Sequence, residues 1–269
     1  MSRIDKAIEM AAKIKNSEPT VPESHREESV REPVNFQPVH QLLLKNPFLV
    51  TLNEPYGVVA EEYNKLKTII SRLANKETKK NTFLVTSAVP SEGKTLTAAN
   101  LAISMARSTD YSVVLIDADL RKPSIHHLFG IEEGFGLVQC LRGKIPFESA
   151  LVKTDLGQLA ILQAGQKIDD PLELLLSKDM KHFVESIKEW DPNSCIIFDS
   201  PPVLPFADAR VLGSLVDNTI FVIRDNFSKK KEVKEGLESL NEANVLGIVC
   251  NDTSHAMGNK YGEYYYQRG

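Results

Sequence analysis

Cysteine is scarce in this sequence, and no two cysteines have the spacing that a cysteine-based site requires. The 269 residues contain three, Cys140, Cys195 and Cys250, far apart in the chain. This pattern excludes a disulfide framework and a CxxC zinc site, and it is typical of a protein kept in a reducing compartment. Because Cys195 and Cys250 lie in apolar segments, we expect all three to be small packing residues.

Long apolar runs and an excess of positive charge are missing as well. The longest apolar runs, such as residues 83–89, are interrupted by Thr and Ser and fall short of the ~18 to 20 residues of a membrane-spanning helix. The first residues lack the features of a signal peptide, so we expect a cytoplasmic protein. With 32 Lys and Arg against 36 Asp and Glu, bulk charge does not favour nucleic acid as a partner.

The composition divides the chain into four segments. Residues 1–16 place apolar side chains at helical spacing and predict an amphipathic helix, either a frayed end or a docking peptide for a partner. Residues 17–39 are rich in Pro, Glu, Ser and Arg and predict a disordered linker. Residues 40–254 have the pattern of a globular domain, and residues 255–269 form a tyrosine-rich tail.

The globular region alternates short apolar runs with longer amphipathic segments. Strands that are apolar on both faces and separated by helices indicate an α/β protein, with a mostly parallel sheet covered by helices on both faces. We expect strands at residues 82–87, 112–116, 159–163, 195–198, 219–223 and 245–250, and helices at residues 57–73, 94–107, 171–190, 207–216 and 229–243.

A glycine-lysine-threonine loop follows the first expected strand and opens the next helix. It is a phosphate-binding loop in which Ala88 replaces the first glycine, although an ordinary helix-capping turn is an alternative. Its amides and the helix dipole would surround the β-phosphate, while Lys94 bridges the phosphates and Thr95 ligates Mg²⁺. We therefore expect ATP and Mg²⁺ as cofactors, bound by Ala88, Pro90, Ser91, Glu92, Gly93, Lys94, Thr95, Leu96 and Arg121.

Carboxylates follow two other expected strands. Asp117 and Asp119 end the second strand and Asp199 ends a later one, at the edge where an open α/β sheet binds its ligand. Asp199 is the natural Walker B residue, although acidic residues at strand ends also cap the next helix. We expect Lys94, Asp117, Asp119 and Asp199 to be catalytic, and Thr95, Asp117 and Asp199 to hold the metal.

Together, the loop at residues 88–95, the run from Asp117 to Arg121 and the Asp-Ser-Pro-Pro run at residues 199–202 resemble the bacterial tyrosine autokinases of exopolysaccharide and capsule synthesis. The resemblance covers about residues 57–269, and a few N-terminal residues are similar to the exosortase-associated subgroup. It implies a P-loop NTPase fold, protein-tyrosine kinase activity and control of polysaccharide polymerisation or export. By match, Asp117 is the base near the acceptor tyrosine and Asp119 supports the metal site.

The resemblance also implies partners. A separate membrane-bound chain-length regulator would activate the kinase through a cytoplasmic segment and recruit it to the inner face of the cell membrane, and other proteins would supply further tyrosine substrates. Four of the seven tyrosines lie in the last nine residues, and a polar tail of phenols suits a phosphoacceptor modified by another copy in trans. Surface packing or an interface anchor are the alternatives for Tyr261, Tyr264, Tyr265 and Tyr266.

Three departures and open points accompany the resemblance. The family's Glu-x-x-Arg-x-x-Arg oligomerisation motif has Asn64 and Lys67 at the arginine positions, so we expect weak self-association. Adjacent histidines point in different directions on a helix, so we expect no metal pair at His126 and His127. Arg224 and Asn251 either border the adenine or are ordinary strand-end residues.

Two other functions share the scaffold. A partitioning or positioning ATPase would carry a signature lysine in a Lys-Gly-Gly pattern, but Val89, Pro90 and Ser91 occupy those positions here. A non-catalytic scaffold that binds nucleotide only to couple with transport is disfavoured by the intact Lys94 and Asp199.

Overall fold

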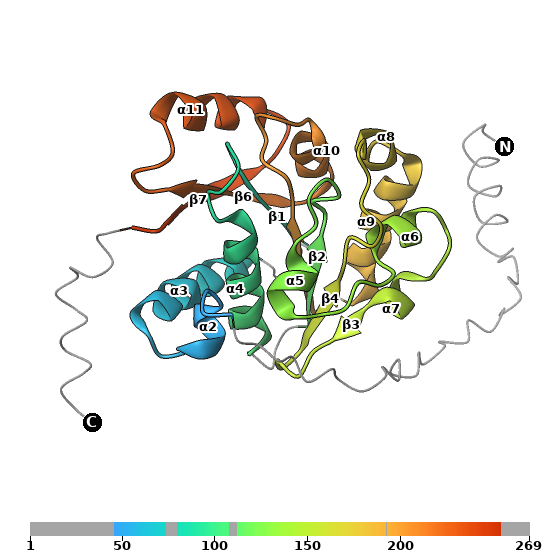
Figure 1. Ribbon diagram of the computed structural model, residues 1–269, viewed down its shortest axis with the longest axis horizontal. Coiled ribbons are helices and arrows are strands. Elements are labelled where there is room, and N and C mark those ends of the chain that lie inside the picture. Colours follow the sequence, from blue (N-terminus) through green and yellow to red (C-terminus); the bar gives the residue numbers. More distant parts are fainter. Residues whose placement is uncertain (1–45, 74–79, 108–111, 192, 254–269) are drawn as a thin grey trace, which may run out of the picture. The chain divides into compact units, whose positions relative to one another are not determined.

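A seven-stranded β-sheet forms the centre of the protein in this computed structural model, which describes residues 46–73, 80–107, 112–191 and 193–253 (Figure 1). The strand order is β3-β4-β2-β5-β1-β6-β7, and every pair is parallel except β3 with β4. This confirms the expected α/β class. The strands are β1 (Thr82–Ser87), β2 (Ser112–Asp117), β3 (Val152–Lys153), β4 (Leu159–Leu162), β5 (Ser194–Asp199), β6 (Asn218–Arg224) and β7 (Val245–Asn251).

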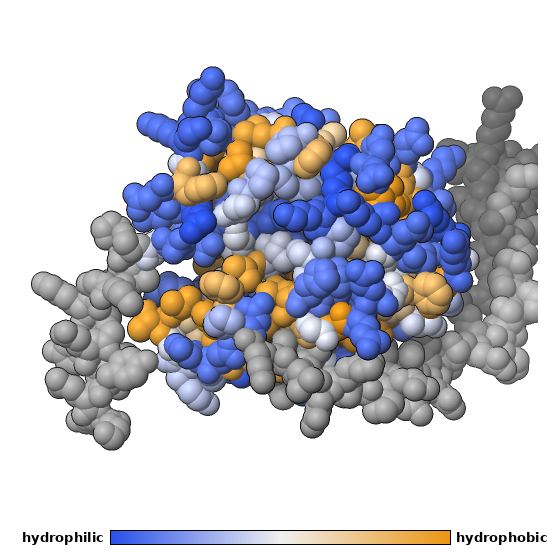
Figure 2. Space-filling view, in the orientation of Figure 1, coloured by the Kyte–Doolittle hydropathy of each residue, from blue (hydrophilic) through white to orange (hydrophobic). Residues whose placement is uncertain are grey.

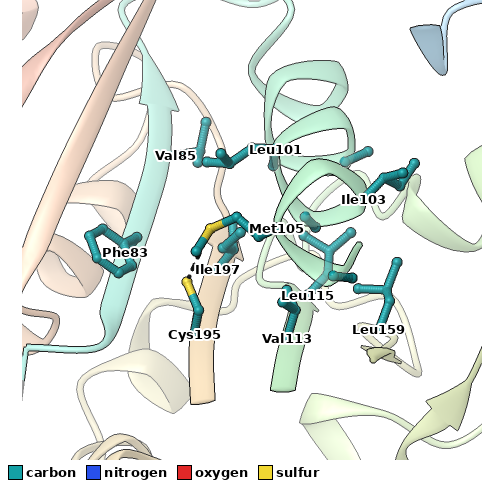
Figure 3. Close-up of a cluster of buried hydrophobic side chains, with 14 of the residues drawn as sticks. Phe83, Val85, Leu101, Ile103, Met105, Val113, Leu115, Leu159, Cys195 and Ile197 are labelled. Carbon is teal, nitrogen blue, oxygen red and sulfur yellow. Dashed lines mark hydrogen bonds between the residues drawn. The ribbon is translucent and has the colours of Figure 1, made fainter. Parts of the chain in front are cut away.

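One face of the sheet is covered by α2 (Val50–Asn53), α3 (Val58–Leu73), α4 (Lys94–Ala106) and α5 (Ile125–Phe129). Alanines make α4 a strong helix former and let it lie close to the strands. Its Leu101 and Met105 are fully buried against β1, β2 and β5 (Figure 3), and burying each such side chain contributes roughly 1.5 to 3 kcal/mol. The thiol of Cys195 lies 3.5 Å from the Met105 sulfur, which confirms its packing role.

The opposite face is covered by helices that follow β2, β4, β5 and β6. Their apolar side chains pack on the other set of strand residues, including Leu84, Ile116 and Phe198. Both faces of the central strands are therefore buried, as the continuous apolar runs predicted. These helices are α6 (Leu137–Leu141), α7 (Phe147–Ala150), α8 (Leu172–Leu175), α9 (Lys178–Trp190), α10 (Asp208–Leu215) and α11 (Lys230–Ser239).

The structure departs from the expected local structure at three points, and two of them are wrong predictions. The helix expected at residues 171–190 is two helices, because Ser177 adopts an extended backbone and its hydroxyl accepts a hydrogen bond from the Met180 amide to begin α9. The helix expected at His126 and His127 is α5, but the short elements β3, α2, α6 and α7 have no counterpart among the expected elements, since none exceeds five residues. Cys250 is exposed on the edge strand β7 and is not a packing residue.

The surface over α2 and α3 carries a group of apolar side chains (Figure 2). Phe48, Val58, Val59 and Ile69 are all exposed there. In the part of the chain that the structure describes, no helix is long and apolar enough to cross a membrane. The predicted N-terminal helix, linker and tyrosine tail lie outside the described residues.

Candidate active site

The register of two neighbouring strands brings the predicted aspartates together. Asp117 on β2 is the direct partner of Asp199 on β5, and the Ala118 amide donates a 2.8 Å hydrogen bond to the Asp199 carbonyl. Both carboxylates are completely buried, and Asp119 is nearly so. The sheet therefore fixes the separation of these side chains through the backbone.

Asp199 is the least satisfied member of this group. Neither of its carboxylate oxygens accepts a hydrogen bond from any residue in the described ranges. Burial raises its pKa to about 6, although the Lys94 ammonium and the Thr95 hydroxyl act to lower it. A buried carboxylate without partners is unfavourable unless a cation or ordered water completes it. Oxygen ligands of this kind suit Mg²⁺, which keeps several of its own waters, so Asp199 fits the expected metal role.

Asp117 is held by the start of α5. Its Oδ2 accepts hydrogen bonds of 2.9 Å from the amides of Ser124 and Ile125, and its Oδ1 accepts a 3.3 Å bond from the Asp119 amide. The capping alternative is thus correct in part. Burial and the charge of Asp199 raise the pKa of Asp117 to about 7, against the effect of the two amides.

Lys94 supplies the positive charge at the centre of the site. Its Nζ lies 3.2 Å from Oδ2 of Asp119 and 3.3 Å from Oγ1 of Thr95. Burial acts to lower the pKa of Lys94, but the charges of Asp199, Asp119 and Asp117 outweigh it and the pKa is raised. The ammonium is therefore charged, and it can exchange Asp119 for a phosphate when nucleotide binds.

The phosphate loop is shaped by two residues with positive φ. Ser91 has a φ of 67° and Gly93 a φ of 92°, and a Cβ at Gly93 would lie 1.9 Å from Nδ2 of Asn251. That Nδ2 donates a 3.1 Å hydrogen bond to the Glu92 carbonyl. Asn251 therefore supports the loop from β7, and sequence reasoning did not anticipate this role.

The Glu92 side chain points into the protein. Its buried carboxylate accepts a 2.8 Å hydrogen bond from the Val89 amide and a second bond from the Ser228 hydroxyl. Ser228 in turn accepts a 2.8 Å bond from the Arg224 amide. The Glu92 side chain thus supports the loop from inside the protein. The backbone of Glu92 is therefore the part of this residue that can face a nucleotide. Ser228 carried no signal in the sequence.

Arg121 is engaged away from the phosphate loop. Its guanidinium donates two hydrogen bonds, of 2.7 and 3.1 Å, to the buried Asp208 at the start of α10 and one of 2.9 Å to the Asp169 carbonyl. It also lies 4.4 Å from the centre of the Phe206 ring. The structure thus gives Arg121 a bridging position between β2 and α10, and direct nucleotide binding remains a prediction.

Asn64 faces inward from α3. Its Oδ1 accepts a 2.9 Å hydrogen bond from the Ser104 hydroxyl of α4, and its Nδ2 donates a 3.1 Å bond to Glu61. Asn64 therefore joins two helices of the domain.

Arg224, the last residue of β6, forms an ion pair with Asp252 at 2.7 Å.

The first comparison defines the class of protein. Residues 78–265 match the ParA family, described as NUBPL iron-transfer P-loop NTPase. The loop geometry, the Lys94 position and the strand-end aspartates agree with that assignment. The chain is a P-loop NTPase of the ParA family.

More similar relatives define the branch. The chain is 35% identical over 219 residues to the tyrosine-protein kinase YwqD of Bacillus subtilis, covering 80% of this chain and 90% of the relative. The solved kinase domain of the Escherichia coli tyrosine kinase ETK is 28% identical, with a TM-score of 0.70, covering 83% of this chain and 87% of that one. The chain belongs to the bacterial tyrosine-protein kinases of capsule and exopolysaccharide regions. The alternative interpretation, a partitioning or positioning ATPase, has weaker support than a tyrosine kinase.

Two further relatives set the scope of this likeness. The chimerical protein CapA2B2 is 26% identical with a TM-score of 0.70, covering 79% of this chain and 93% of that one. The tyrosine-protein kinase etk of Escherichia coli K12 is 33% identical, and the match spans only 28% of its length. This chain therefore corresponds to the kinase portion of such longer proteins.

Proposed function

We propose that this protein kinase uses Mg²⁺ and ATP to phosphorylate its own C-terminal tyrosines and thereby regulates exopolysaccharide polymerisation or export. The observation that carries the proposal is the unpaired, buried Asp199 beside the charged Lys94 and the phosphate loop. Similarity to tyrosine-protein kinases over most of the chain supports the proposal. The tail at residues 260–269 supplies the acceptors.

The site residues divide the work of phosphoryl transfer. The loop amides and Lys94 hold the phosphates, while Thr95 and Asp199 would hold Mg²⁺, which supplies charge neutralisation on the phosphate oxygens. The γ-phosphoryl group passes from ATP to a tyrosine oxygen, the phenol proton goes to Asp117, and ADP leaves. Because the transition state is loose, positioning and charge account for most of the acceleration.

Asp117 contributes mainly by position. A phenol has a pKa of ~10, and a carboxylate near 4 is a poor acceptor for its proton. Burial and the charge of Asp199 raise the pKa of Asp117 to about 7, but a cation bound beside the two carboxylates would lower it again, so orientation of the phenol outweighs basicity. The bonds from α5 keep the carboxylate oriented.

The kinase assignment also supports a role for the tyrosine-rich tail and for partner proteins. We infer that a tail reaches the site of another copy, so transfer occurs in trans. Each added phosphate brings about −1.5 to −2 charges, and the modified tail would be repelled from a site with three aspartates. The resemblance also supports a membrane chain-length regulator that activates the kinase through a cytoplasmic segment, and protein substrates beyond the tail.

The proposal is tested by mapping phosphate on the purified protein after incubation with labelled ATP and Mg²⁺. Replacing Tyr261, Tyr264, Tyr265 and Tyr266 with Phe should remove most of the label and leave ATP binding unchanged. Tyr56→Phe is the matched control, because Tyr56 is 94% exposed and lies outside the tail. Phosphate found mainly on Tyr56 or Tyr63 would overturn the assignment of the tail.

A further inference from the structure

His126, His127 and Glu133 converge on one side of α5. The ring centroids of the two histidines are 3.9 Å apart, so the expectation that adjacent histidines point apart is wrong. Nε2 of His126 lies 3.4 Å from a carboxylate oxygen of Glu133. The candidate ligand atoms of the three residues all lie within 4.8 Å of one another.

The backbone after α5 brings Glu133 back over the histidines. The helix ends at Gly130, whose φ of 64° permits a sharp reversal, and the Ile131 amide donates a 2.8 Å bond to the His126 carbonyl. The side chain of Gln163, after β4, then donates a 3.0 Å bond to the Glu132 carbonyl. The loop that carries Glu133 is therefore fixed at two points.

His126 has an unsatisfied ring nitrogen. Its side chain is only 9% exposed, its Nε2 lies 3.4 Å from a carboxylate oxygen of Glu133, and this nitrogen has no hydrogen-bond partner within the described part of the chain. Most buried polar atoms in proteins have hydrogen-bond partners, so a buried nitrogen without one indicates a place for a ligand.

The geometry points to a binding site for a divalent transition-metal ion at His126, His127 and Glu133, with Zn²⁺ the best match. Two imidazoles and one carboxylate form a set that zinc accepts, with a fourth position left for water. Mg²⁺ and Ca²⁺ prefer oxygen ligands and fit this set poorly. The site is separate from the phosphate loop, where the predicted metal ligands are oxygens.

The site adjoins the catalytic machinery through α5. The amides of Ser124 and Ile125 hold Asp117, and Ile125 immediately precedes His126. A cation that links α5 to the loop at Glu133 would therefore immobilise the support of Asp117.

The test is calorimetric titration of the metal-stripped, full-length protein with Zn²⁺ in excess Mg²⁺, which competes for the aspartates. Removing one ligand by His127→Gln or Glu133→Gln should weaken Zn²⁺ binding by more than ~10-fold. Both side chains are exposed, so folding should survive, and circular dichroism checks it. His182→Gln is the matched control, because His182 pairs with Glu185 at 3.6 Å and the described residues supply no third ligand there.

A second probe separates this site from other zinc-binding groups. Co²⁺ should give visible absorption bands in the unaltered protein and in His182→Gln, and these bands should be lost in His127→Gln and Glu133→Gln. Equal Zn²⁺ affinity and equal Co²⁺ spectra in all four proteins would overturn the proposal. The readouts require no kinase activity, so this result is independent of the proposed function.

Discussion

Asp117 and Asp199 face each other across two neighbouring parallel strands, and the charge of Asp199 adds to burial in raising the pKa of Asp117 to about 7. Among the described residues, the ammonium of Lys94 is in direct contact with Asp119. Two buried carboxylates side by side are unfavourable without a cation, and this is a physical reason to expect a metal ion together with the nucleotide that the family binds.

Asp199→Asn should stabilise the nucleotide-free protein while it removes activity. The pKa of Asp199 is raised from 3.8 to about 6, so the folded state binds the proton more tightly than the unfolded state does. Stability is therefore lost as pH rises from 3.8 to about 6. At pH 8 the free energy of unfolding of Asp199→Asn should be higher than that of the unaltered protein by roughly 1 to 3 kcal/mol. Its turnover should be lower by about 100-fold.

Denaturant unfolding at pH 4.5 and pH 8 checks this expectation. Asp155→Asn is the control, because Asp155 is exposed and its replacement should leave both the stability difference and turnover unchanged. A destabilised Asp199→Asn protein at pH 8 would show that the favourable interactions of Asp199 with Lys94 and Thr95 outweigh the cost of its burial, which would contradict this prediction.

Ser228→Ala should loosen the phosphate loop. The change removes the hydroxyl that donates to Glu92 and accepts from the Arg224 amide, so we expect about 1 kcal/mol of lost stability and a several-fold higher KM for ATP. Ser239→Ala removes a hydroxyl that donates to the Gly236 carbonyl within α11, and it serves as control. Equal KM values in the two variants would exclude a loop-supporting role for Ser228.

Ser91→Gly should relieve backbone strain. Ser91 has a φ of 67°, a region that costs a non-glycine residue on the order of 1 kcal/mol or more. Glycine adopts it freely, so the variant should melt at a higher temperature. Asn226 has a similar φ of 56°, but asparagine tolerates this region, and Asn226→Gly should bring a smaller gain. A lower melting temperature for Ser91→Gly would show that the hydroxyl stabilises the loop by other means.

Self-association through α3 should be weak, and an arginine at position 64 should be unfavourable. Asn64 bonds the Ser104 hydroxyl, so Asn64→Arg removes that acceptor and should lower stability by about 1 kcal/mol. Sedimentation of the unaltered protein should show a monomer or a weak oligomer at micromolar concentration, and Lys67→Arg alone should leave folding intact. A stable ring in the unaltered protein would contradict this expectation.

The periodic parts of the fold could be predicted from sequence. The strand at Thr82–Ser87 was placed with the correct ends, and the five other predicted strands were displaced by at most one residue at either end. Continuous apolar runs and a glycine-lysine-threonine turn are strong local signals. The two-residue β3 and the short helices α2, α6 and α7 carry too little periodicity to be recognised.

The clustering of the main site residues could be predicted from the sequence, but the hydrogen-bond partners of others could not, and the difference has a physical reason. Lys94, Asp117, Asp119 and Asp199 were placed together because parallel strands end at one edge. The partners of Glu92 and Arg121 could not be predicted, since Ser228 and Asp208 lie 136 and 87 positions away in sequence. Long-range hydrogen bonds leave no periodic trace, so tertiary structure is needed to find them.

The central claim is that Lys94 and its neighbours phosphorylate the tail of another copy. Lys94→Met, which keeps the tail, is mixed with the protein whose tail tyrosines are Phe, which keeps the site, and labelled ATP and Mg²⁺ are added. Either protein alone should incorporate little phosphate. The mixture should place label on the tail of Lys94→Met, as mass spectrometry can show. Labelling of Lys94→Met alone at the level of the unaltered protein would contradict the account.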